Sequence, residues 1–224
     1  MTQQLYDKII RSSRRKTMAI SVSADNEVVV RVPAAAPEQA IEQFIAGNAE
    51  WIKAKKQHFA GRQRPKKQFV AGEEFYFKGQ LYPLEFSDSQ LTPLIFDQKF
   101  IVASRYASRC RELLERFYKL KAEELITERV KLYAQTFNLK YSKIRFNNAA
   151  RQWGSCSHEG NLSFVWRLVM MPTRIIDYVV AHELAHLNEL NHSPKFWREV
   201  ERMRPDYSEL RKFLKENGHN YTLD

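Results

Sequence analysis

The stretch VVAHELAHLNELNHSPKFW, residues 179–197, most constrains the fold of this chain. His182 and His186 are four residues apart, so on a helix they project from one face and can reach a single metal ion. Glu183 follows the first histidine, and in HExxH helices this glutamate lies near the metal without binding it and accepts a proton from water. The neighbouring residues are mostly apolar. The stretch therefore predicts a buried helix that binds zinc and carries a general base.

A catalytic zinc site takes three protein ligands and keeps one position open, so a third ligand has to come from elsewhere. His192 lies too far along the chain for the same straight helix to deliver it. Ser193 and Pro194 have the pattern of an N-cap and a first helical residue, which places His192 in a connection between two helices. Asn188 and Asn191 tolerate left-handed backbone and are predicted to turn the chain back toward the metal.

The first part of the chain has the residue pattern of strands around one helix. Alternating apolar residues predict strands over 17–23 and 27–33, joined by a turn at Asp25 and Asn26. Pro37 is suited to the first turn of a helix that is expected to run to about residue 55.

Two further hairpins are predicted after a polar, basic linker at residues 61–67. They cover 72–86, with a turn at Lys78 and Gly79, and 94–102. We therefore expect residues 1–103 to form a β-rich basic N-terminal unit with one helix.

From about residue 104 the apolar period changes from two to 3.6, which predicts one long amphipathic helix over 113–137. Strands are predicted at 142–147 and 161–168, and Thr173 is expected to cap the helix that carries the histidines. A last helix at 207–217 is expected to end at Gly218. The predicted fold class is α+β, with residues 104–224 as the catalytic domain.

The charge balance is strongly basic, with 36 Lys and Arg against 26 Asp and Glu and a net charge of +10. Such a surface favours weak association with nucleic acid or another polyanion, although a solvated face that keeps the protein soluble is the more common case. Much of the excess lies in the first seventy residues: Arg11, Arg14, Arg15, Lys16, Lys53, Lys55, Lys56, Arg62, Arg64, Lys66 and Lys67.

The chain has neither an N-terminal apolar segment of the signal-peptide kind nor an apolar run long enough to span a bilayer. No membrane partner is therefore expected. Cys110 and Cys156 lie far apart in the sequence, which indicates a reducing compartment. A cytoplasmic location is the expectation.

The motifs RQWGSCS (151–157), GNLSFVWRLVMMP (160–172) and YVVAHELAHLNELNHSPKFW (178–197) together resemble the YgjP-like family of bacterial metal-dependent hydrolases. This family is related to the SprT-like metallopeptidases within the zincin group. The resemblance covers most of the chain and is most specific over residues 151–197.

The resemblance implies a zincin-like catalytic domain in which His182, His186 and His192 bind zinc. It also implies that Glu183 is the general base for a metal-activated water. The strand at 161–168 is by the same resemblance the candidate to bind an extended peptide by edge pairing.

Arg151 has two interpretations: a contact to an anionic group of the substrate, or a structural ion pair. Trp153 is expected to pack in the core. Cys156 has His158 nearby, but without an oriented third group the pair is a poor nucleophile and base, so we expect a small buried cysteine.

Three functions compete. The leading one is a zinc-dependent metallopeptidase that acts on protein or peptide. The second, attributed to bacterial members of the family, is a metal-dependent nucleoside triphosphate pyrophosphohydrolase with a UTP-type substrate, although the chain has no P-loop and only seven glycines. The third is a noncatalytic binding protein in which zinc only holds two helices together. A structural zinc site needs no proton acceptor, so this function leaves Glu183 without a role. The sequence fixes neither the substrate nor the oligomeric state.

Overall fold

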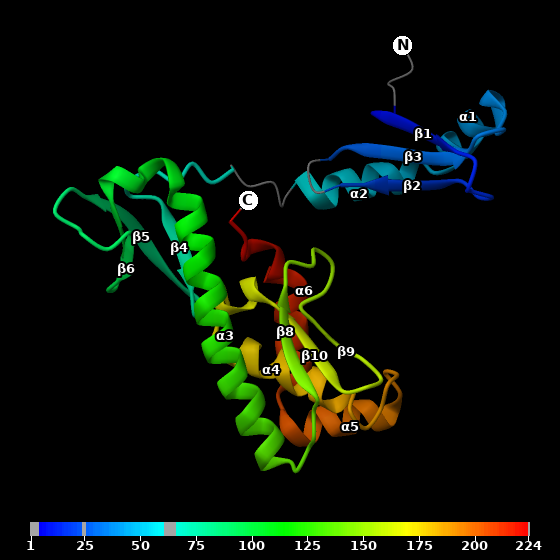
Figure 1. The fold of residues 1–224 in the computed structure, drawn as a ribbon. Coiled ribbons are helices and arrows are strands. Elements are labelled where there is room, and N and C mark those ends of the chain that lie inside the picture. The colour runs from blue at the N-terminus through cyan, green and yellow to red at the C-terminus, as the bar shows by residue number, and fades with distance from the viewer. Residues whose placement is uncertain (1–4, 24–25, 61–65, 224) are drawn as a thin grey trace. The chain divides into compact units, whose positions relative to one another are not determined.

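The computed structural model describes residues 5–23, 26–60 and 66–223. The chain divides into two compact units, Met1–Lys66 and Lys67–Asp224, and each has its own hydrophobic core. Figure 1 shows the elements of both units.

The first unit holds a three-stranded sheet and two helices. Its elements are β1 (Lys8–Ser12), β2 (Ala19–Val22), β3 (Val28–Pro33), α1 (Glu38–Gly47) and α2 (Ala49–Ala60). The strand order is β1-β3-β2, with β1 parallel and β2 antiparallel to β3. The predicted hairpin is confirmed, and Asn26 takes the positive φ of 61° that its turn requires. Asp25 lies outside the described residues. Strand β1 was not predicted, because only two apolar residues mark it.

The single helix predicted from Pro37 is divided at Asn48. Asn48 has a φ of −109°, and its side-chain amide donates to the Phe44 carbonyl at 2.7 Å. This contact satisfies a carbonyl at the end of α1 and offers the backbone an alternative to a continuous helix. Ile41 of α1 and Ile52 of α2 still reach the same core, which they share with the valines of β3.

The second unit begins with a four-stranded sheet. Its strands are β4 (Glu74–Phe77), β5 (Gln80–Ser87), β6 (Leu94–Phe96) and β7 (Phe100–Ala103), in the order β4-β5-β7-β6. Both predicted hairpins are confirmed. Positive φ angles at Lys78 (50°), Gly79 (84°) and Gln98 (52°) close their turns.

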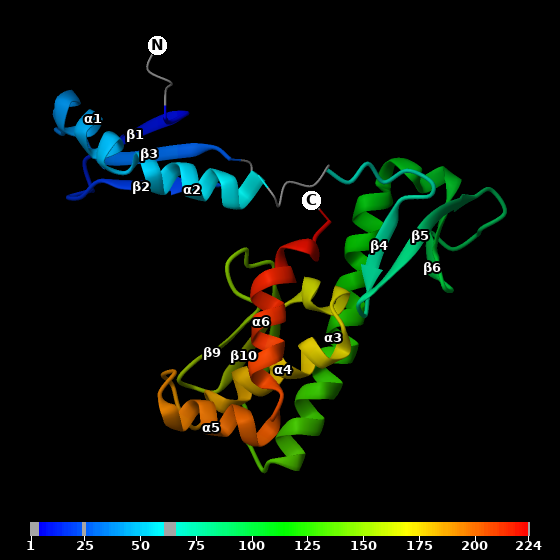
Figure 2. The ribbon, with the colours of Figure 1, turned by 180° about the vertical axis from the view of Figure 1, so that it is seen from behind.

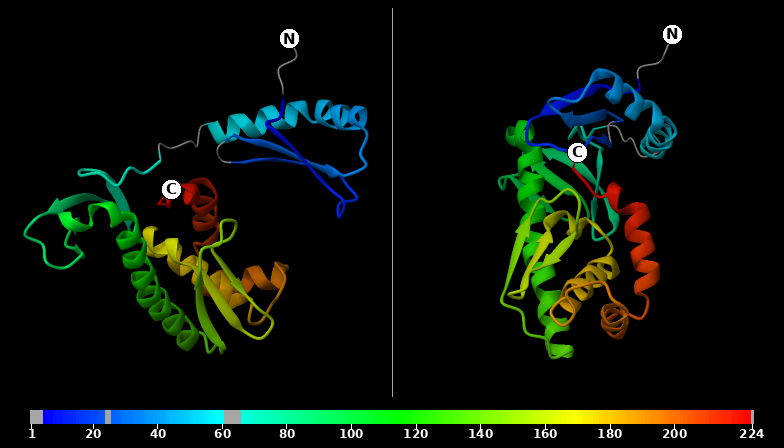
Figure 3. Two further views of the ribbon diagram at one scale, coloured as in Figure 1. Left: turned by 45° about the horizontal axis from the view of Figure 1, so that its top comes forward. Right: turned by 90° about the vertical axis from the view of Figure 1, so that its right-hand side faces the viewer.

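The long helix α3 organises the rest of the second unit. The further elements are α3 (Cys110–Thr136), β8 (Lys143–Asn147), β9 (Gly154–Cys156), β10 (Asn161–Val165), α4 (Thr173–Ala185), α5 (Pro194–Met203) and α6 (Tyr207–Asn217). Helix α3 contacts β6 near one end and both α4 and β8 farther along, as Figures 1 and 2 show from opposite sides. In Figure 3, α4 lies between the β8-β10-β9 sheet and the helices α5 and α6. The predicted α+β fold class is confirmed.

The predicted domain boundary between residues 103 and 104 is wrong, because the two compact units meet at Lys66 and Lys67. Phe75, Phe77 and Phe100 of the sheet belong to the same core as Tyr118 of α3. The Tyr118 hydroxyl also donates to the Tyr76 carbonyl at 2.7 Å. The change of apolar period near residue 104 therefore marks the passage from strands to a helix within one domain, and not a boundary between two domains. The predicted linker is the true boundary, and its residues 61–65 lie outside the described residues.

The predicted helix ends have mixed outcomes. Ser193 caps α5 by accepting a hydrogen bond from the Phe196 amide at 3.3 Å, and Gly218 is the C-cap of α6, both as predicted. Thr173 is not a cap, because it is the first residue of α4 and Pro172 holds the N-cap position without a side-chain hydrogen bond.

Candidate metal centre

Helix α4 carries His182 and Glu183, and His186 is its C-cap. Ile175, Ile176, Val180 and Leu184 are fully buried on its sides. Each such side chain contributes about 1.5–3 kcal/mol to folding, so packing holds the helix in place. His182 is half-buried on this helix, whereas most of its neighbours on α4 are buried.

The chain turns directly after α4, which ends at Ala185. The His186 ring donates through Nδ1 to the Glu189 carbonyl at 3.0 Å, and Asn191 accepts a hydrogen bond from the Ser193 amide at 3.2 Å. The predicted left-handed backbone at Asn188 and Asn191 is wrong, because neither has a positive φ. Side-chain hydrogen bonds shape this turn.

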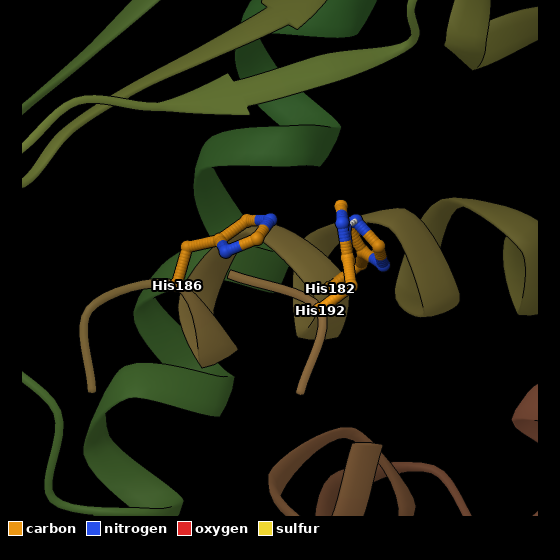
Figure 4. Close-up of side chains that lie close together, drawn as sticks. All are labelled: His182, His186 and His192. Carbon is orange, nitrogen blue, oxygen red and sulfur yellow. Dashed lines mark hydrogen bonds between the residues drawn. The ribbon is translucent and has the colours of Figure 1, made fainter. Parts of the chain in front are cut away.

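The turn brings His192 back to the other two histidines. Nε2 of His192 lies 3.1 Å from Nε2 of His182, and one ring nitrogen of each histidine lies within 4.8 Å of the others. Figure 4 shows His186 on one side of the group and His182 and His192 together on the other. The structure therefore gathers the three residues that the sequence analysis selected.

The chemistry of these donors fits a zinc ion. A carbonyl only accepts, so the hydrogen bond to Glu189 places the ring proton of His186 on Nδ1 and leaves the Nε2 lone pair free for a metal. Two nitrogens about 2.1 Å from a tetrahedral zinc lie about 3.4 Å apart, close to the observed 3.1 Å between His182 and His192.

Burial also favours the neutral rings that a metal requires. Desolvation lowers the pKa of His182 to about 3, with smaller contributions from the charges of His186, His192 and Arg211. Desolvation likewise lowers the pKa of His186. In the described part of the chain, Nδ1 of His182 is buried without a hydrogen-bond partner. Burying this ring is costly, and a bound cation on its other nitrogen would compensate for that cost.

Glu183 follows His182 on α4 and packs against Gly154 of strand β9. Its side chain is buried, and this burial raises the pKa of Glu183 to about 8. A Cβ atom at Gly154 would come within 2.6 Å of Glu183 Oε1 and 2.8 Å of its Cδ. The glycine in the RQWGSCS motif therefore makes the space that the carboxylate occupies.

The other motif residues surround this contact. Trp153 packs against the core and beside Gly218, as predicted. Desolvation raises the pKa of Cys156 to about 11, and the charge of Glu183 acts in the same direction. The thiol therefore stays protonated, which agrees with a structural cysteine. Arg151 is exposed in the loop before β9, and no carboxylate among the described residues pairs with it. The structural ion-pair interpretation of Arg151 has no support.

The edge of the second sheet differs from the prediction. Strand β10, which covers most of the predicted peptide-binding strand, is the central strand of the β8-β10-β9 sheet and pairs on both sides. Strands β8 and β9 are the edge strands, and Gly154 of β9 lies against Glu183. Strand β9 was not predicted, because three small residues are too few to show the alternation of apolar and polar residues that marks a strand.

An aromatic wall of Tyr178, Trp197 and Tyr207 borders the histidines, and it was not predicted from the sequence. The Trp197 ring lies 5.7 Å from His192, 5.9 Å from His182 and 5.4 Å from Tyr207, centroid to centroid. The Tyr178 ring lies 6.0 Å from His182. Tyr178 precedes His182 by four residues, so helical spacing alone could have predicted that the two side chains lie on one face of the helix. Tyr207 comes from α6, and nothing local in the sequence connects it to the site.

The described basic residues of the first unit include both paired and exposed side chains. Arg11 pairs with Glu38 at 2.6 Å, and Lys53 and Lys55 are exposed on α2. Arg62 and Arg64 lie outside the described residues. Within the described ranges, every helix is too short or too polar to cross a bilayer.

The fold and the histidine group define a metal-dependent, peptidase-like hydrolase. Residues 16–217 match the family described as YgjP-like, metallopeptidase domain. The chain therefore belongs to the YgjP-like metallopeptidase family.

The metallopeptidase zymogen abylysin of Pyrococcus abyssi has a solved structure that is 20% identical to this chain, with a TM-score of 0.37. The alignment covers 41% of this chain and 93% of that chain. A search among curated proteins gave no match.

Proposed function

We propose that this protein is a zinc-dependent metallopeptidase that cleaves peptide bonds with water. The observation that carries the proposal is the convergence of His182, His186 and His192, whose ligand nitrogens lie within 4.8 Å of one another. The buried Glu183 directly follows His182 on helix α4. A structural zinc site usually has four protein ligands and needs no proton acceptor. Here three histidines among the described residues would act as ligands, and a carboxylate, Glu183, directly follows the first of them.

The three imidazoles would hold the ion through the nitrogen that faces the group. His186 is fixed for this role by its bond to Glu189, and His192 is placed by the turn before α5. When bound, zinc acidifies a water molecule and polarises the carbonyl of the substrate. The exposed side of His192 leaves the group open to solvent and substrate.

Glu183 would act as the general base. Burial raises its pKa, and the charge of a bound zinc ion would oppose this shift and favour the ionised form. The carboxylate would then take a proton from the attacking water and pass it to the leaving amine, a role that typically contributes about 10²–10⁴ in rate. Contact with Gly154 on one side limits where the carboxylate can go. The helix backbone and the strand thus hold the proton acceptor in place before substrate arrives.

Strand β9 favours a peptide over a nucleotide as the substrate. Among the described strands it pairs only with β10, so its other edge is free for an extended chain. Peptides commonly bind by adding a strand to such an edge, because main-chain hydrogen bonds recognise any sequence. Since Gly154 lies on β9 and touches Glu183, an added strand would run past the general base.

The test combines metal analysis with two substrate classes. Purified protein is loaded with zinc and assayed on denatured protein and on nucleoside triphosphates, together with Glu183→Gln. We expect one zinc per chain in both proteins, peptide hydrolysis by the parent and a loss of about 10²–10⁴ in the variant.

Other outcomes contradict the proposal in different ways. Hydrolysis of nucleoside triphosphates alone would assign the same site to the pyrophosphohydrolase chemistry. Stoichiometric zinc without hydrolysis of either class would favour a binding protein. Full activity of Glu183→Gln would show that Glu183 is not the general base. Weak binding of polyanions by the basic first unit remains a separate proposal, tested by the salt dependence of nucleic-acid binding.

A further inference from the structure

Helix α6 brings a cation to the aromatic wall beside the histidines. The guanidinium of Arg211 lies 4.5 Å from the centroid of the Trp197 ring. That ring lies 5.7 Å from His192 and 5.9 Å from His182, so one aromatic side chain separates Arg211 from two of the proposed ligands. Helix α6 also contacts α4 directly.

The charge of Arg211 acts on the site. Desolvation raises the pKa of Tyr178 to about 12, and the positive charge of Arg211 is the largest influence in the opposite direction. Tyr178 lies one helical turn before His182 and is itself affected by Glu183. The charge of Arg211 therefore reaches Tyr178, the buried ring of the aromatic wall that lies next to His182.

The donors of Arg211 are free for a ligand. The side chain is exposed, and no carboxylate in the described ranges lies within ion-pair distance of it, unlike Arg202, Arg204 and Arg174, which all have acidic partners nearby. A guanidinium presents five N–H donors in a planar fork that matches a carboxylate. Stacking on Trp197 restricts the side chain, so less entropy is lost when it binds an anion.

We propose that Arg211, held on the face of Trp197, is a subsite that binds a carboxylate of the peptide substrate next to the metal centre. This inference rests on the proposed peptidase function, whose substrate it narrows to peptides with an acidic group close to the scissile bond. The carboxylate is either the C-terminus of the peptide or the side chain of an acidic residue. Both offer the same two oxygens to the guanidinium.

Two matched pairs of peptides distinguish the sources. One pair differs only in a free or amidated C-terminus, and the other has Glu or Gln beside the scissile bond. Arg211→Met removes the charge but keeps an apolar stem that can cover Trp197, and Arg211→Lys keeps the charge without the fork. The matched control is Lys212→Gln, an exposed cation at the next position of the same helix.

Affinity is measured by calorimetry in the Glu183→Gln background, so that peptides bind without being cleaved. We expect the parent to prefer at least one carboxylate peptide over its neutral partner by about fivefold or more, as a charge-assisted hydrogen bond at an exposed site allows. Arg211→Met should abolish this preference, Arg211→Lys should restore part of it, and Lys212→Gln should keep it. The same titrations on metal-free protein separate binding by Arg211 from ligation of the metal.

The outcomes for the subsite and for the peptidase are separate. Peptide hydrolysis with the same carboxylate preference in Arg211→Met and parent would overturn the subsite and leave the peptidase standing. Arg211-dependent carboxylate binding without any hydrolysis by the parent would support the subsite and contradict the peptidase. The absence of any preference in the parent, in both peptide pairs, would also overturn the subsite.

Discussion

Gly154 lies directly against the carboxylate of Glu183: a Cβ at position 154 would come within 2.6 Å of Oε1 and 2.7 Å of Cγ. Real Cβ atoms do not approach other heavy atoms so closely, so any side chain at this position has to move the glutamate or the strand. Gly154 has no positive φ, and its role is therefore space rather than backbone freedom. Strand β9 and helix α4 are thereby locked to each other at the proposed general base.

Substitution Gly154→Ala should displace the Glu183 carboxylate. We expect kcat to fall by about 10²-fold or more while zinc content is unchanged, because the ligands are not touched. Overpacking should also lower the free energy of unfolding by about 1–3 kcal/mol. Steady-state kinetics, metal analysis and urea denaturation measure these three effects. Gly47→Ala is the control, since a Cβ there meets nothing within 4 Å. A fully active Gly154→Ala enzyme would show that the carboxylate does not work where the structure places it.

The third ligand can be tested by stability instead of activity. Zinc at about 1,000 times its Kd should stabilise the native protein by about 4 kcal/mol, because the unfolded chain has no preformed site. His192→Ala should lose most of this gain. His158→Ala, an exposed histidine outside the group, should keep it. The measurement is thermal denaturation of the second unit with and without zinc. An unchanged zinc-dependent shift in His192→Ala would mean that another side chain completes the coordination.

Asp177 should be important for stability, since it joins three segments of the second unit. It is buried and accepts from Arg129 of α3 at 2.5 and 2.9 Å, and from Arg204 after α5 at 3.4 Å. Removal of one partner from such a buried pair costs about 3 kcal/mol, so Asp177→Asn should lower the urea midpoint clearly.

The control for this pair is Asp206→Asn, because Asp206 pairs with Arg204 at 2.7 Å at the surface. An exposed ion pair contributes less than about 1 kcal/mol. Equal losses of stability in the two variants would mean that Asp177 does not hold the helices together.

The reactivity of Cys156 should depend on pH in a defined way. Burial raises its thiol pKa to about 11, so the reactive thiolate is scarce at pH 8 and increases as the pH rises toward that value. In a Cys110→Ser background, alkylation followed by mass spectrometry should be slow at pH 8 and faster by pH 10. Rapid alkylation at neutral pH would reopen a nucleophilic role for this cysteine.

The sequence by itself determined the features that depend on local spacing. The turns at Lys78 and Gln98 follow from short-range pattern, and the i, i+4 spacing of His182 and His186 fixes their common face once a helix forms. The cap at Ser193 has the same origin. These features need only neighbouring residues, which the sequence displays directly.

The tertiary structure decided what depends on contacts between distant segments. Phe75, Phe100 and Tyr118 share one core, so the domain boundary lies at Lys66. The apolar period of the sequence changes only some forty residues later. The space at Gly154 and the position of Arg211 depend on which element packs beside α4. Burial energy selects these partners, and it depends on the whole core rather than on any short pattern.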